Sequence, residues 1–326
     1  MKALALFSGG LDSTLAIRLV QDQNIDVIGF HFKSPFHSSN DECGVLKTAE
    51  NLSIPLETLE ADQDYLDIIK NPRFGYGKNL NPCIDCRIFI LKKAKAIAST
   101  VDASFLFTGE VLGERPMSQT MKALRLIERE TELEQQILRP LSAKLLPITE
   151  AEEQGWIDRG RLLDIHGRSR RRQLELAKAY GFTSFPTPAG GCLLTVKEFA
   201  AKMRDLLKWK NDVDFRDVNL LKIGRHFRLG NAKIIVGRDE AENDRLLALR
   251  KDEELCFEVP DCGSPVTLLQ GASGTRTAIE TAAALTLRYS DNTAPRATVM
   301  YGSTDLNRAI TVRSLDVSDI ESLRVK

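Results

Sequence analysis

The sequence predicts an α/β protein with a doubly wound parallel sheet, followed by a smaller α+β domain. In the first half of the chain, short apolar runs alternate with amphipathic stretches, which is typical of βαβ units with parallel strands. In the last third, short apolar runs surround a helix at 277–288. We therefore expect domains at 1–205 and 214–326, with the boundary at 205–215, after an amphipathic helix at 196–210.

The expected elements follow from apolar spacing and from Pro and Gly. Strands are expected at 3–7, 26–32, 55–59 and 104–108, and helices at 13–21, 42–52 and 86–99. The helix at 86–99 follows Asn81-Pro82 and has one apolar face. Residues 141–188 have a helical, Arg-rich pattern, and 185–191 form a Pro- and Gly-rich loop. In the last third, strands are expected at 233–236, 255–259, 266–269 and 309–312.

Length and charge limit the classes of function. The 326 residues carry 45 Lys and Arg against 45 Asp and Glu, so a nucleic-acid partner has to be bound by a local basic patch. No apolar run approaches the roughly 20 residues of a membrane helix, and the first residues read as a strand and a turn rather than a signal peptide. Six cysteines are few for a secreted scaffold of this length. We therefore expect a cytoplasmic protein with no membrane partner.

A glycine-rich turn, SGGLDS at 8–13, lies between the first strand and the first helix. Backbone N–H groups and a helix N-terminus bind anions in this geometry, and Gly9 and Gly10 let the backbone approach a phosphate closely. Ser8 and Ser13 add hydroxyl donors, while Asp12 is expected to hold Mg²⁺, because a carboxylate beside phosphates needs a cation between them. The spacing is neither GxxxxGK[ST] nor GxGxxG. A plain β-to-α turn is the alternative.

The SGGLDS run resembles the PP-loop signature of the ATP pyrophosphatases, which adenylate an oxygen and release pyrophosphate. Further segments in the same order resemble the catalytic half of the tRNA 4-thiouridine synthetases: 29–35, 108–113, 118–120 and 139–141. The resemblance covers about residues 1–200 and implies a PP-loop, Rossmann-like sheet. That family normally carries an RNA-binding region ahead of the loop, whereas this loop starts at residue 8, so RNA binding is expected to be relocated or lost.

The same resemblance implies a nucleotide pocket built on two strand ends. It places Phe30, His31 and Phe32 around the adenine, and Thr108, Gly109 and Glu110 beside the nucleotide. Ligands of open parallel sheets bind at this carboxyl edge. Core packing for His31 and Phe32, and a helix cap for Glu110, are the alternatives.

Three cysteines are candidates for the sulfur chemistry. Cys83 and Cys86 form a CxxC at a predicted helix start, where the helix dipole is expected to lower the thiol pKa, and Cys192 lies in a loop that can fold back toward them. Three thiolates can hold three irons of a [4Fe–4S] cluster and leave the fourth iron open to hydrosulfide. This layout is similar to that of cluster-dependent tRNA thiolases that share the PP-loop fold. A persulfide on Cys86 or Cys192, or inert cysteines, are the alternatives; zinc is less favoured, because a closed site takes four ligands.

Two features predict RNA binding. An Arg-rich stretch is a candidate footprint for the phosphate backbone, or else a solvated helix face; it contains Arg159, Arg161, Arg168, Arg170, Arg171 and Arg172. Farther on, 236–239 and 242–244 resemble the NFACT-R domain, an RNA-binding module of ribosome-quality-control proteins. In that domain Arg238, Lys233 and Arg245 are candidates for phosphate contacts, although the usual aromatic and basic segment that follows is replaced here by 256–265.

The remaining cysteines, Cys43, Cys256 and Cys262, are expected to pack in buried positions.

These resemblances imply an ATP-dependent tRNA thiouridine synthetase that adenylates a uridine carbonyl and replaces the oxygen by sulfur, with 4-thiouridine at position 8 favoured. The implied catalytic residues are Asp12, Cys83, Cys86 and Cys192. ATP, Mg²⁺ and a [4Fe–4S] cluster are the implied cofactors, and tRNA and sulfide or a sulfur carrier the partners; the family parallel also makes a homodimer plausible. The alternatives are a wobble 2-thiouridine synthetase, a persulfide-type thiolase, a PP-loop amide or nitrile ligase for a small molecule, and a non-enzymatic RNA-binding or redox-sensing module.

Overall fold

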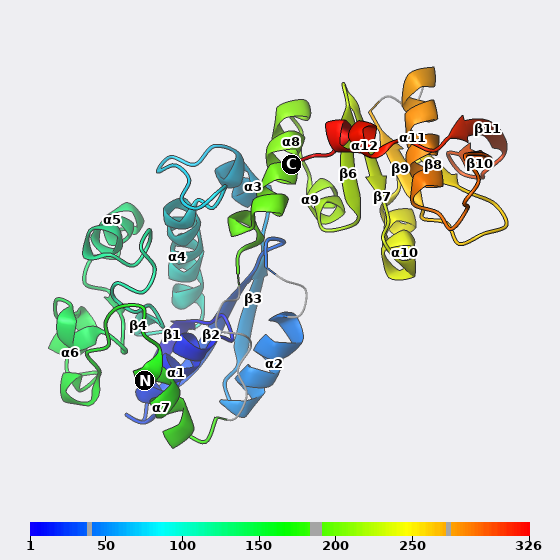
Figure 1. Ribbon diagram of the computed structural model, residues 1–326. Helices are drawn as coiled ribbons and strands as arrows, with labels where there is room; N and C mark the ends of the chain where they lie inside the picture. Colours follow the sequence, from blue (N-terminus) through cyan, green and yellow to red (C-terminus); the bar gives the residue numbers. More distant parts are fainter. Residues whose placement is uncertain (38–40, 183–190, 272–274) are drawn as a thin grey trace. The chain divides into compact units, whose positions relative to one another are not determined.

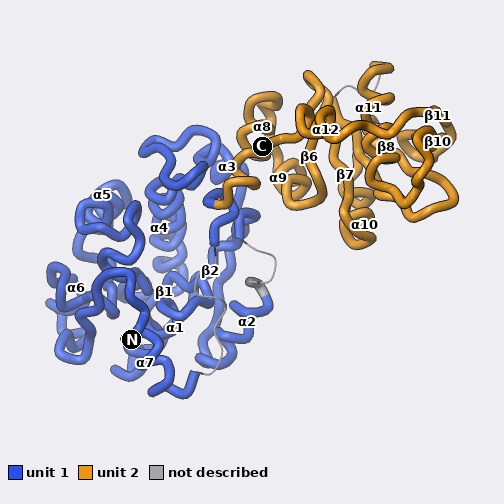
Figure 2. The backbone as a smooth tube through the Cα atoms, in the orientation of Figure 1, with its two compact units in different colours: residues 1–195 blue, residues 196–326 orange. Residues whose placement is uncertain are grey.

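The computed structural model of the chain describes residues 1–37, 41–182, 191–271 and 275–326 (Figure 1). The chain divides into two compact units, Met1–Thr195 and Val196–Lys326 (Figure 2). The expected boundary was 205–215, so the helix expected at 196–210 falls in the second unit instead of closing the first. Most of the expected loop 185–191 lies outside the described residues.

The first unit is built on a parallel sheet with the strand order β3-β2-β1-β4-β5. The strands are β1 (Lys2–Leu6), β2 (Asp26–Lys33), β3 (Leu56–Glu60), β4 (Phe105–Thr108) and β5 (Ile137–Leu138). The order reverses direction at β1, because β2 and β3 follow on one side and β4 and β5 on the other. The doubly wound α/β fold is therefore confirmed, with its switch point between β1 and β4, where ligands bind in open sheets.

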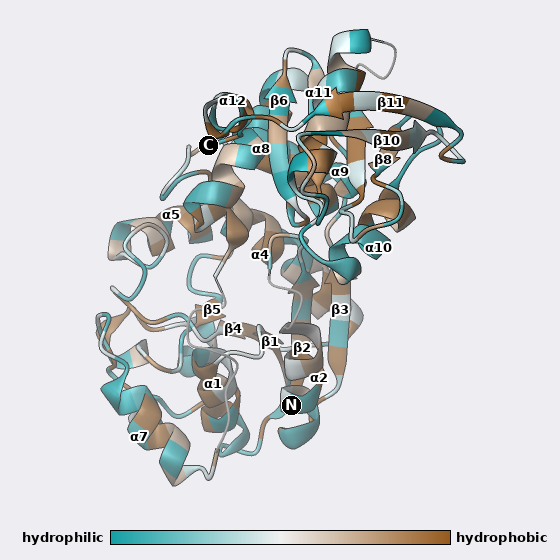
Figure 3. Cartoon of the chain, turned by 45° about the vertical axis from the view of Figure 1, so that its right-hand side comes forward, coloured by the Kyte–Doolittle hydropathy of each residue, from teal (hydrophilic) through white to brown (hydrophobic). Residues whose placement is uncertain are grey.

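The helices of the first unit are α1 (Leu11–Gln21), α2 (Asp41–Asn51), α3 (Gln63–Lys70), α4 (Cys83–Thr100), α5 (Met121–Thr131), α6 (Glu150–Glu153) and α7 (Arg171–Ala179). Buried side chains of β1 and α1, such as Ala5 and Leu15, share one hydrophobic core with Ala177 of α7. Figure 3 shows that α7 carries both hydrophobic and hydrophilic residues, as expected for a helix with one buried face. The stretch 141–188, expected to be helical, contains only short helices among its described residues, because Pro147 and Gly155 interrupt it.

The second unit contains an antiparallel sheet with the strand order β11-β10-β8-β9-β7-β6. Its strands are β6 (Arg225–Leu229), β7 (Ala232–Val236), β8 (Leu255–Glu258), β9 (Thr267–Gln270), β10 (Arg296–Gly302) and β11 (Arg308–Arg313). Its helices are α8 (Lys197–Trp209), α9 (Phe215–Leu221), α10 (Glu240–Leu249), α11 (Arg276–Arg288) and α12 (Val317–Leu323). The smaller α+β domain is confirmed, but the expectation of a single good helix is wrong, since α9, α10 and α12 also form.

Both faces of this second sheet are covered. Ile234 belongs to a core shared with Leu285 of α11, while its neighbour Ile235 belongs to a core shared with Leu246 of α10. Successive residues of a strand point to opposite faces, so α10 and α11 lie on opposite faces of the sheet. Within the described ranges, no helix of either unit is long and apolar enough to cross a membrane.

Candidate active site

The turn after β1 has the geometry of an anion-binding loop. Gly9 has a φ of +71°, in the left-handed region, and a Cβ there would lie 2.9 Å from a methyl carbon of Val45. The Thr14 amide donates to the Gly10 carbonyl over 3.1 Å, so α1 starts immediately and the amides of its first turn have no partner within the helix. The Ser8 and Ser13 hydroxyl oxygens lie 3.2 Å apart. The Ser13 hydroxyl donates to the Gly10 carbonyl over 2.9 Å, so the hydroxyls hold the turn while the first-turn amides are placed to donate to a phosphate.

The segment after β4 packs directly on that turn. A Cβ on Gly109 would lie 2.5 Å from the Ser13 nitrogen and 2.6 Å from the Asp12 carbonyl carbon, so only glycine fits there. The structure thus gives Gly109 a packing role that the sequence did not show. The contact also places Thr108 and Glu110 next to the phosphate loop.

One cavity of about 250 Å³ connects these elements at the switch point of the sheet. Predicted site residues that line it are Ser8, Gly10, Asp12, Ser13, Phe30, His31, Phe32, Cys83, Cys86, Thr108, Gly109, Glu110, Arg170 and Cys192. Further lining residues include Tyr65, Arg87, Arg115, Ser118 and Gln119. The structure therefore brings the expected nucleotide residues and the three candidate cysteines to one place, while Gly9 shapes the turn without lining the cavity.

The predicted adenine residues on β2 also serve the core. Phe30 and Phe32 are buried, and the Phe32 ring centroid lies 5.0 Å from that of Tyr65. The His31 Nδ1 lies 3.1 Å from the Phe7 carbonyl oxygen, which ties β2 to the start of the phosphate loop. Both interpretations therefore apply to these residues. They pack in the core, which the sequence left as the alternative, and they also line the cavity.

Asp12 presents an unsatisfied carboxylate to the cavity. Its Oδ1 is buried and accepts no hydrogen bond of normal geometry among the described residues, although the fully buried amide of Gln173 lies near enough to lower the pKa of Asp12. Burial and the charge of Glu114 raise the pKa of Asp12 to about 6, against the opposing effect of Arg170, whose Nη2 lies 3.6 Å from Oδ2. An orphaned carboxylate oxygen beside a phosphate-binding turn fits a Mg²⁺ ligand. No cluster of three metal-binding side chains occurs in the described part of the chain, so phosphate and water oxygens would complete the coordination.

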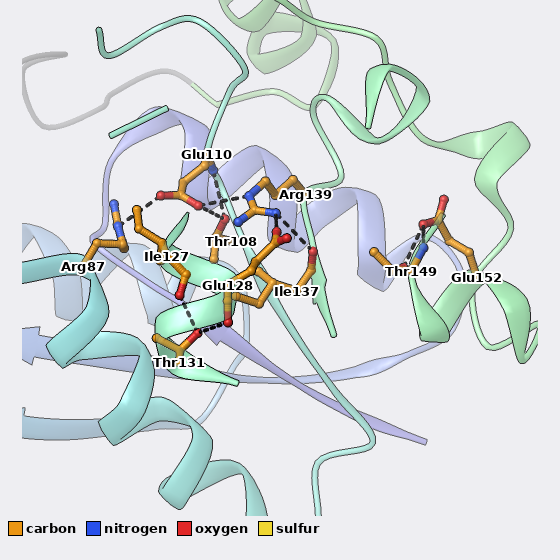
Figure 4. A network of polar contacts seen from close by, with 10 residues as sticks. All are labelled: Arg87, Thr108, Glu110, Ile127, Glu128, Thr131, Ile137, Arg139, Thr149 and Glu152. Atoms are coloured by element: carbon orange, nitrogen blue, oxygen red, sulfur yellow. Dashed lines mark hydrogen bonds and ion pairs between the residues drawn. The ribbon is translucent and has the colours of Figure 1, made fainter. Parts of the chain in front are cut away.

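Glu110 is held in a buried network of charges (Figure 4). Its carboxylate lies 3.0 Å from Arg87 Nε and accepts from Arg139 Nε over 3.1 Å, and these two arginines lie on opposite sides of it. Burial raises the pKa of Glu110, but the Arg87 and Arg139 charges and hydrogen bonds outweigh that effect and lower it. Glu110 does not cap the next helix, since Thr120 is the cap of α5. It instead orients Arg87, the residue directly after Cys86.

The three candidate cysteines come from two segments. Cys83 is the first residue of α4, and Cys86 follows one turn later. Cys192 precedes a short 3-10 turn that is anchored by the Leu193 amide, which donates to the Phe36 carbonyl over 2.8 Å. All three line the same cavity, so the donor set fits a soft metal or cluster, although the described residues hold no ready-made group of three ligands.

The expectation of low thiol pKa values is wrong. Burial raises the pKa of the Cys83 and Cys86 thiols, and raises that of Cys192 to about 12. Desolvation of a thiolate in this cavity therefore outweighs the dipole of α4. The expectation of burial is also wrong for Cys43, which is exposed, whereas Cys256 is buried as expected.

The predicted RNA-contacting arginines of the first unit lie in different surroundings. Arg170 donates to Glu114 over 2.7 Å and lines the cavity, so it lies beside the expected nucleotide residues and not on an open basic surface. Arg171 and Arg172 are exposed and pair with Glu175 and Asp164, at 2.9 and 2.7 Å. Arg168 is exposed.

In the second unit, the recognised motif has structural contacts. Arg238 Nε donates to the Glu242 carboxylate at 2.9 and 3.0 Å, and this buried carboxylate also accepts the Gly224 amide. The Asn243 side chain accepts the Val266 amide over 2.9 Å. Lys233 is buried, which lowers its pKa to about 8, so a surface phosphate contact for Lys233 is wrong.

Sequence reasoning missed Arg115. Its exposed side chain lines the cavity and makes no ion pair among the described residues, unlike Arg87 and Arg170. Its charge acts on Asp12 on one side of the cavity and on Cys83 and Cys192 on the other. Arg115 lies between the segments 108–113 and 118–120, which resemble the 4-thiouridine synthetases, and this position could have marked it as a candidate site residue.

Two family models match separate parts of the chain. Residues 1–144 match the model described as thiamine biosynthesis protein (ThiI). Residues 224–324 match the model described as NFACT protein RNA binding domain. Both predicted resemblances are confirmed.

Similar curated proteins match part of the chain. The "tRNA-specific 2-thiouridylase MnmA" of Petrotoga mobilis is 31% identical over 130 residues, 34% of this chain and 35% of that protein. The "Probable tRNA sulfurtransferase" of Alkaliphilus metalliredigens is 32% identical over 143 residues, 44% of this chain and 36% of that protein. The chain thus spans about a third of the length of these relatives.

Two solved structures align more weakly. A crystal structure of a 4-thiouridine synthetase–RNA complex with bound ATP aligns at 23% identity with a TM-score of 0.36, covering 57% of this chain and 54% of that chain. The U34-tRNA thiolase NcsA from Methanococcus maripaludis with its [4Fe-4S] cluster aligns at 17% identity with a TM-score of 0.35, covering 64% of this chain and 67% of that chain.

Proposed function

We propose that the chain is an ATP-dependent tRNA sulfurtransferase, which adenylates a uridine carbonyl oxygen of tRNA and replaces that oxygen by sulfur. The observation that carries the proposal is that one cavity is lined both by the phosphate loop and by Cys83, Cys86 and Cys192. A reaction that activates an oxygen with ATP and then brings in sulfur needs these two groups of residues within reach of one uridine. The similarity to curated tRNA thiolases supports the same reaction class.

In the first step, the ATP phosphates lie over the turn at 8–13 and accept hydrogen bonds from the first-turn amides of α1, while the Ser8 and Ser13 hydroxyls hold the turn. Mg²⁺ at Asp12, when bound, supplies positive charge that offsets the phosphates. The uridine carbonyl oxygen attacks the α-phosphorus, and pyrophosphate leaves with the electron pair of the broken P–O bond. Arg115, free of ion pairs among the described residues, stabilises the developing charge.

In the second step, sulfur at the oxidation level of sulfide attacks the adenylated ring carbon. The bond from that carbon to the AMP oxygen breaks and AMP leaves with its electron pair, so no oxidant is needed. Cys83, Cys86 and Cys192 would hold the [4Fe–4S] cluster, which supplies a soft Lewis acid for the sulfur when bound. Glu110 keeps Arg87 beside Cys86, so a fixed cation lies near the sulfur-bearing end of the cavity.

The raised thiol pKa values support a cluster over a persulfide. A persulfide route needs a cysteine thiolate as nucleophile, and burial, which raises the pKa of Cys86 and Cys192, disfavours the thiolate form of both. A bound metal centre deprotonates its thiol ligands by its own charge. We propose 4-thiouridine at position 8 as the product, sulfide as the simplest donor, and the second unit, which matches an RNA-binding family model, as a holder of the tRNA.

The test is nucleoside mass spectrometry of an unmodified tRNA transcript incubated anaerobically with the iron- and sulfide-reconstituted full chain, ATP, Mg²⁺ and added sulfide as the sulfur donor. We expect a thiouridine that requires ATP and forms together with AMP and pyrophosphate; its identity separates 4-thiouridine from 2-thiouridine. Omission of ATP and the variant Asp12→Asn are the controls. Pyrophosphate release that depends on ammonia or an amine, with no thiouridine, would replace this proposal by a small-molecule ligase.

A further inference from the structure

We propose that the outer face of the β10–β11 hairpin, defined by Arg296, Thr298, Thr311 and Arg313, binds the phosphate backbone of RNA. The inference rests on the proposed function, because it takes tRNA as the partner. It assigns RNA contact to residues outside both predicted RNA-binding groups, the Arg-rich stretch and Arg238.

The strand register places two cations side by side. Arg296 on β10 lies directly opposite Arg313 on β11, and Thr298 lies opposite Thr311, with the two hydroxyl oxygens 3.3 Å apart. Directly opposite residues of an antiparallel pair have Cβ atoms roughly 4.5–5.5 Å apart, and like charges at such positions destabilise the pair. Among the described residues, no ion pair joins Arg296 or Arg313 to a carboxylate. The hairpin thus keeps two uncompensated positive charges together.

These side chains point away from the core. Val299 and Val312 are buried in the core shared with α11, whereas Arg296, Thr298 and Arg313 are exposed, as the alternation of a strand requires. Elsewhere on the outer face, Leu246 of α10 packs over Leu268 of β9. The hairpin end of that face presents guanidinium groups and hydroxyls to solvent, which are the donors that bind phosphate oxygens.

Protection of a sheet edge accounts for one charge, but not for a like charge directly opposite it. Charges on an edge strand prevent edge-to-edge aggregation, and Arg313 on the edge strand β11 would be enough for that. The pairing of β10 with β8 covers only Met300–Gly302, so Arg296 also lies on a stretch that is open on one side. Glu258, opposite Met300, is on the same face, but Met300 is four residues along β10 from Arg296, or roughly 13 Å at strand spacing. A polyanion is the partner that compensates two adjacent cations. Both strands lie within residues 224–324, which match an RNA-binding family model, and this favours RNA over an acidic protein.

The first test compares binding of an unmodified tRNA transcript to the full chain and to the double variant Arg296→Gln/Arg313→Gln over a range of NaCl concentrations. We expect the affinity to fall by roughly tenfold or more at 0.1 M salt, and the slope of log K against log salt to decrease by about two, since each phosphate contact contributes about 0.9. Arg308→Gln is the matched control, because Arg308 lies on the same strand but its side chain belongs to the opposite face. Its tRNA affinity should equal that of the wild type.

The second test separates binding from folding. Arg313→Glu places a carboxylate opposite Arg296, so we expect its thermal midpoint to rise while its tRNA affinity falls. An Arg313→Glu protein that is more stable and binds tRNA as the wild type does would overturn the inference. An equal loss of tRNA affinity in Arg308→Gln would also overturn it. So would a double variant that binds polyglutamate, a probe for an acidic protein, more weakly than the wild type but binds tRNA equally well.

The outcomes also distinguish this inference from the proposed function. If the wild type binds no tRNA, both fail. If the wild type binds tRNA and forms thiouridine but the double variant binds equally well, only the assignment of the hairpin fails.

Discussion

The hydroxyl oxygen of Tyr65 lies 3.2 Å from the sulfur of Cys86. Tyr65 is 3% exposed, and its ring also packs against Phe89, with 5.5 Å between the ring centroids. Burial raises the pKa of Tyr65 well above its usual value, so the phenol keeps its proton and can donate to a thiolate. The aromatic core of the first unit therefore positions Cys86, one of the three cysteines proposed to hold the cluster.

Tyr65→Phe is expected to raise the pKa of the Cys86 thiol further, because burial already raises it and the hydrogen bond from Tyr65 is the first effect that opposes this. The pH profile of Cys86 alkylation, followed by peptide mass spectrometry in the unreconstituted protein, measures the change. Cys83 in the same sample is the internal control. An unchanged profile for Cys86 would mean that the contact does not act on the thiolate.

Gly109→Ala is expected to disrupt the phosphate loop, since the added Cβ would lie 2.5 Å from the backbone nitrogen of Ser13. Overpacking of this kind destabilises by roughly 1–3 kcal/mol, and displacement of the first turn of α1 should reduce ATP-dependent pyrophosphate release by at least about tenfold. Thermal denaturation and a pyrophosphate assay measure the two effects. Ser104→Ala, at an exposed position just before β4, should match the wild type in both; wild-type values for Gly109→Ala would contradict the packing argument.

Asp12→Asn is expected to make the protein more stable at neutral pH while abolishing adenylation. The pKa of Asp12 is raised from its ordinary 3.8 to about 6, so its contribution to stability is complete below pH 3.8 and is lost as the pH rises through 6. At pH 7 the ionised, partly buried carboxylate therefore destabilises the fold by about 3 kcal/mol, which the amide removes. Thermal midpoints of both proteins at pH 4 and pH 7 give the comparison. If the thermal midpoints of the two proteins change by the same amount between pH 4 and pH 7, the raised pKa of Asp12 is disproved.

We expect Arg115→Gln to impair adenylation and Arg139→Gln to impair stability. Arg115 makes no ion pair among the described residues, so its loss is expected to leave the thermal midpoint unchanged and to slow adenylation by roughly 10- to 100-fold. Arg139 is buried and pairs with Glu110 and Glu128, so its loss is expected to destabilise the fold by roughly 3–5 kcal/mol. Denaturant unfolding and single-turnover AMP formation separate the two. A large stability loss in Arg115→Gln would show that Arg115 has a structural role.

Replacement of Cys83, Cys86 or Cys192 by Ser is expected to reduce iron and acid-labile sulfide retained after anaerobic reconstitution, because all three thiols line one cavity. The matched control is Cys256→Ser, which alters a buried cysteine of the second unit and should retain the wild-type iron content. Full iron retention in Cys192→Ser would remove that residue from the ligand set.

Local patterns were enough to predict the strands and the phosphate turn of the first unit. The strand expected at 26–32 is β2, and the turn at 8–13 adopts the expected strand-to-helix geometry, because hydrophobic alternation and glycine placement act within a few residues. The roles of Tyr65 and Arg115 could not be predicted, since each depends on segments that only the fold brings together.

Charge patterns were the least informative. Arg170 directly precedes the exposed Arg171 in sequence, yet α7 packs beside α1 and places Arg170 in the cavity. Arg238, expected on an RNA surface, is exposed and lies just before α10, where it pairs with Glu242 of the first helical turn. Net charge and clustering cannot show which cations are already neutralised.

The backbone contact between Gly109 and Ser13 leaves no free space between the end of β4 and the phosphate turn. The first turn of α1 therefore cannot move toward β4 without pressing on Gly109, whose neighbour Glu110 pairs with Arg87, the residue directly after Cys86. A short series of contacts thus joins the phosphate turn to the segment that carries Cys86.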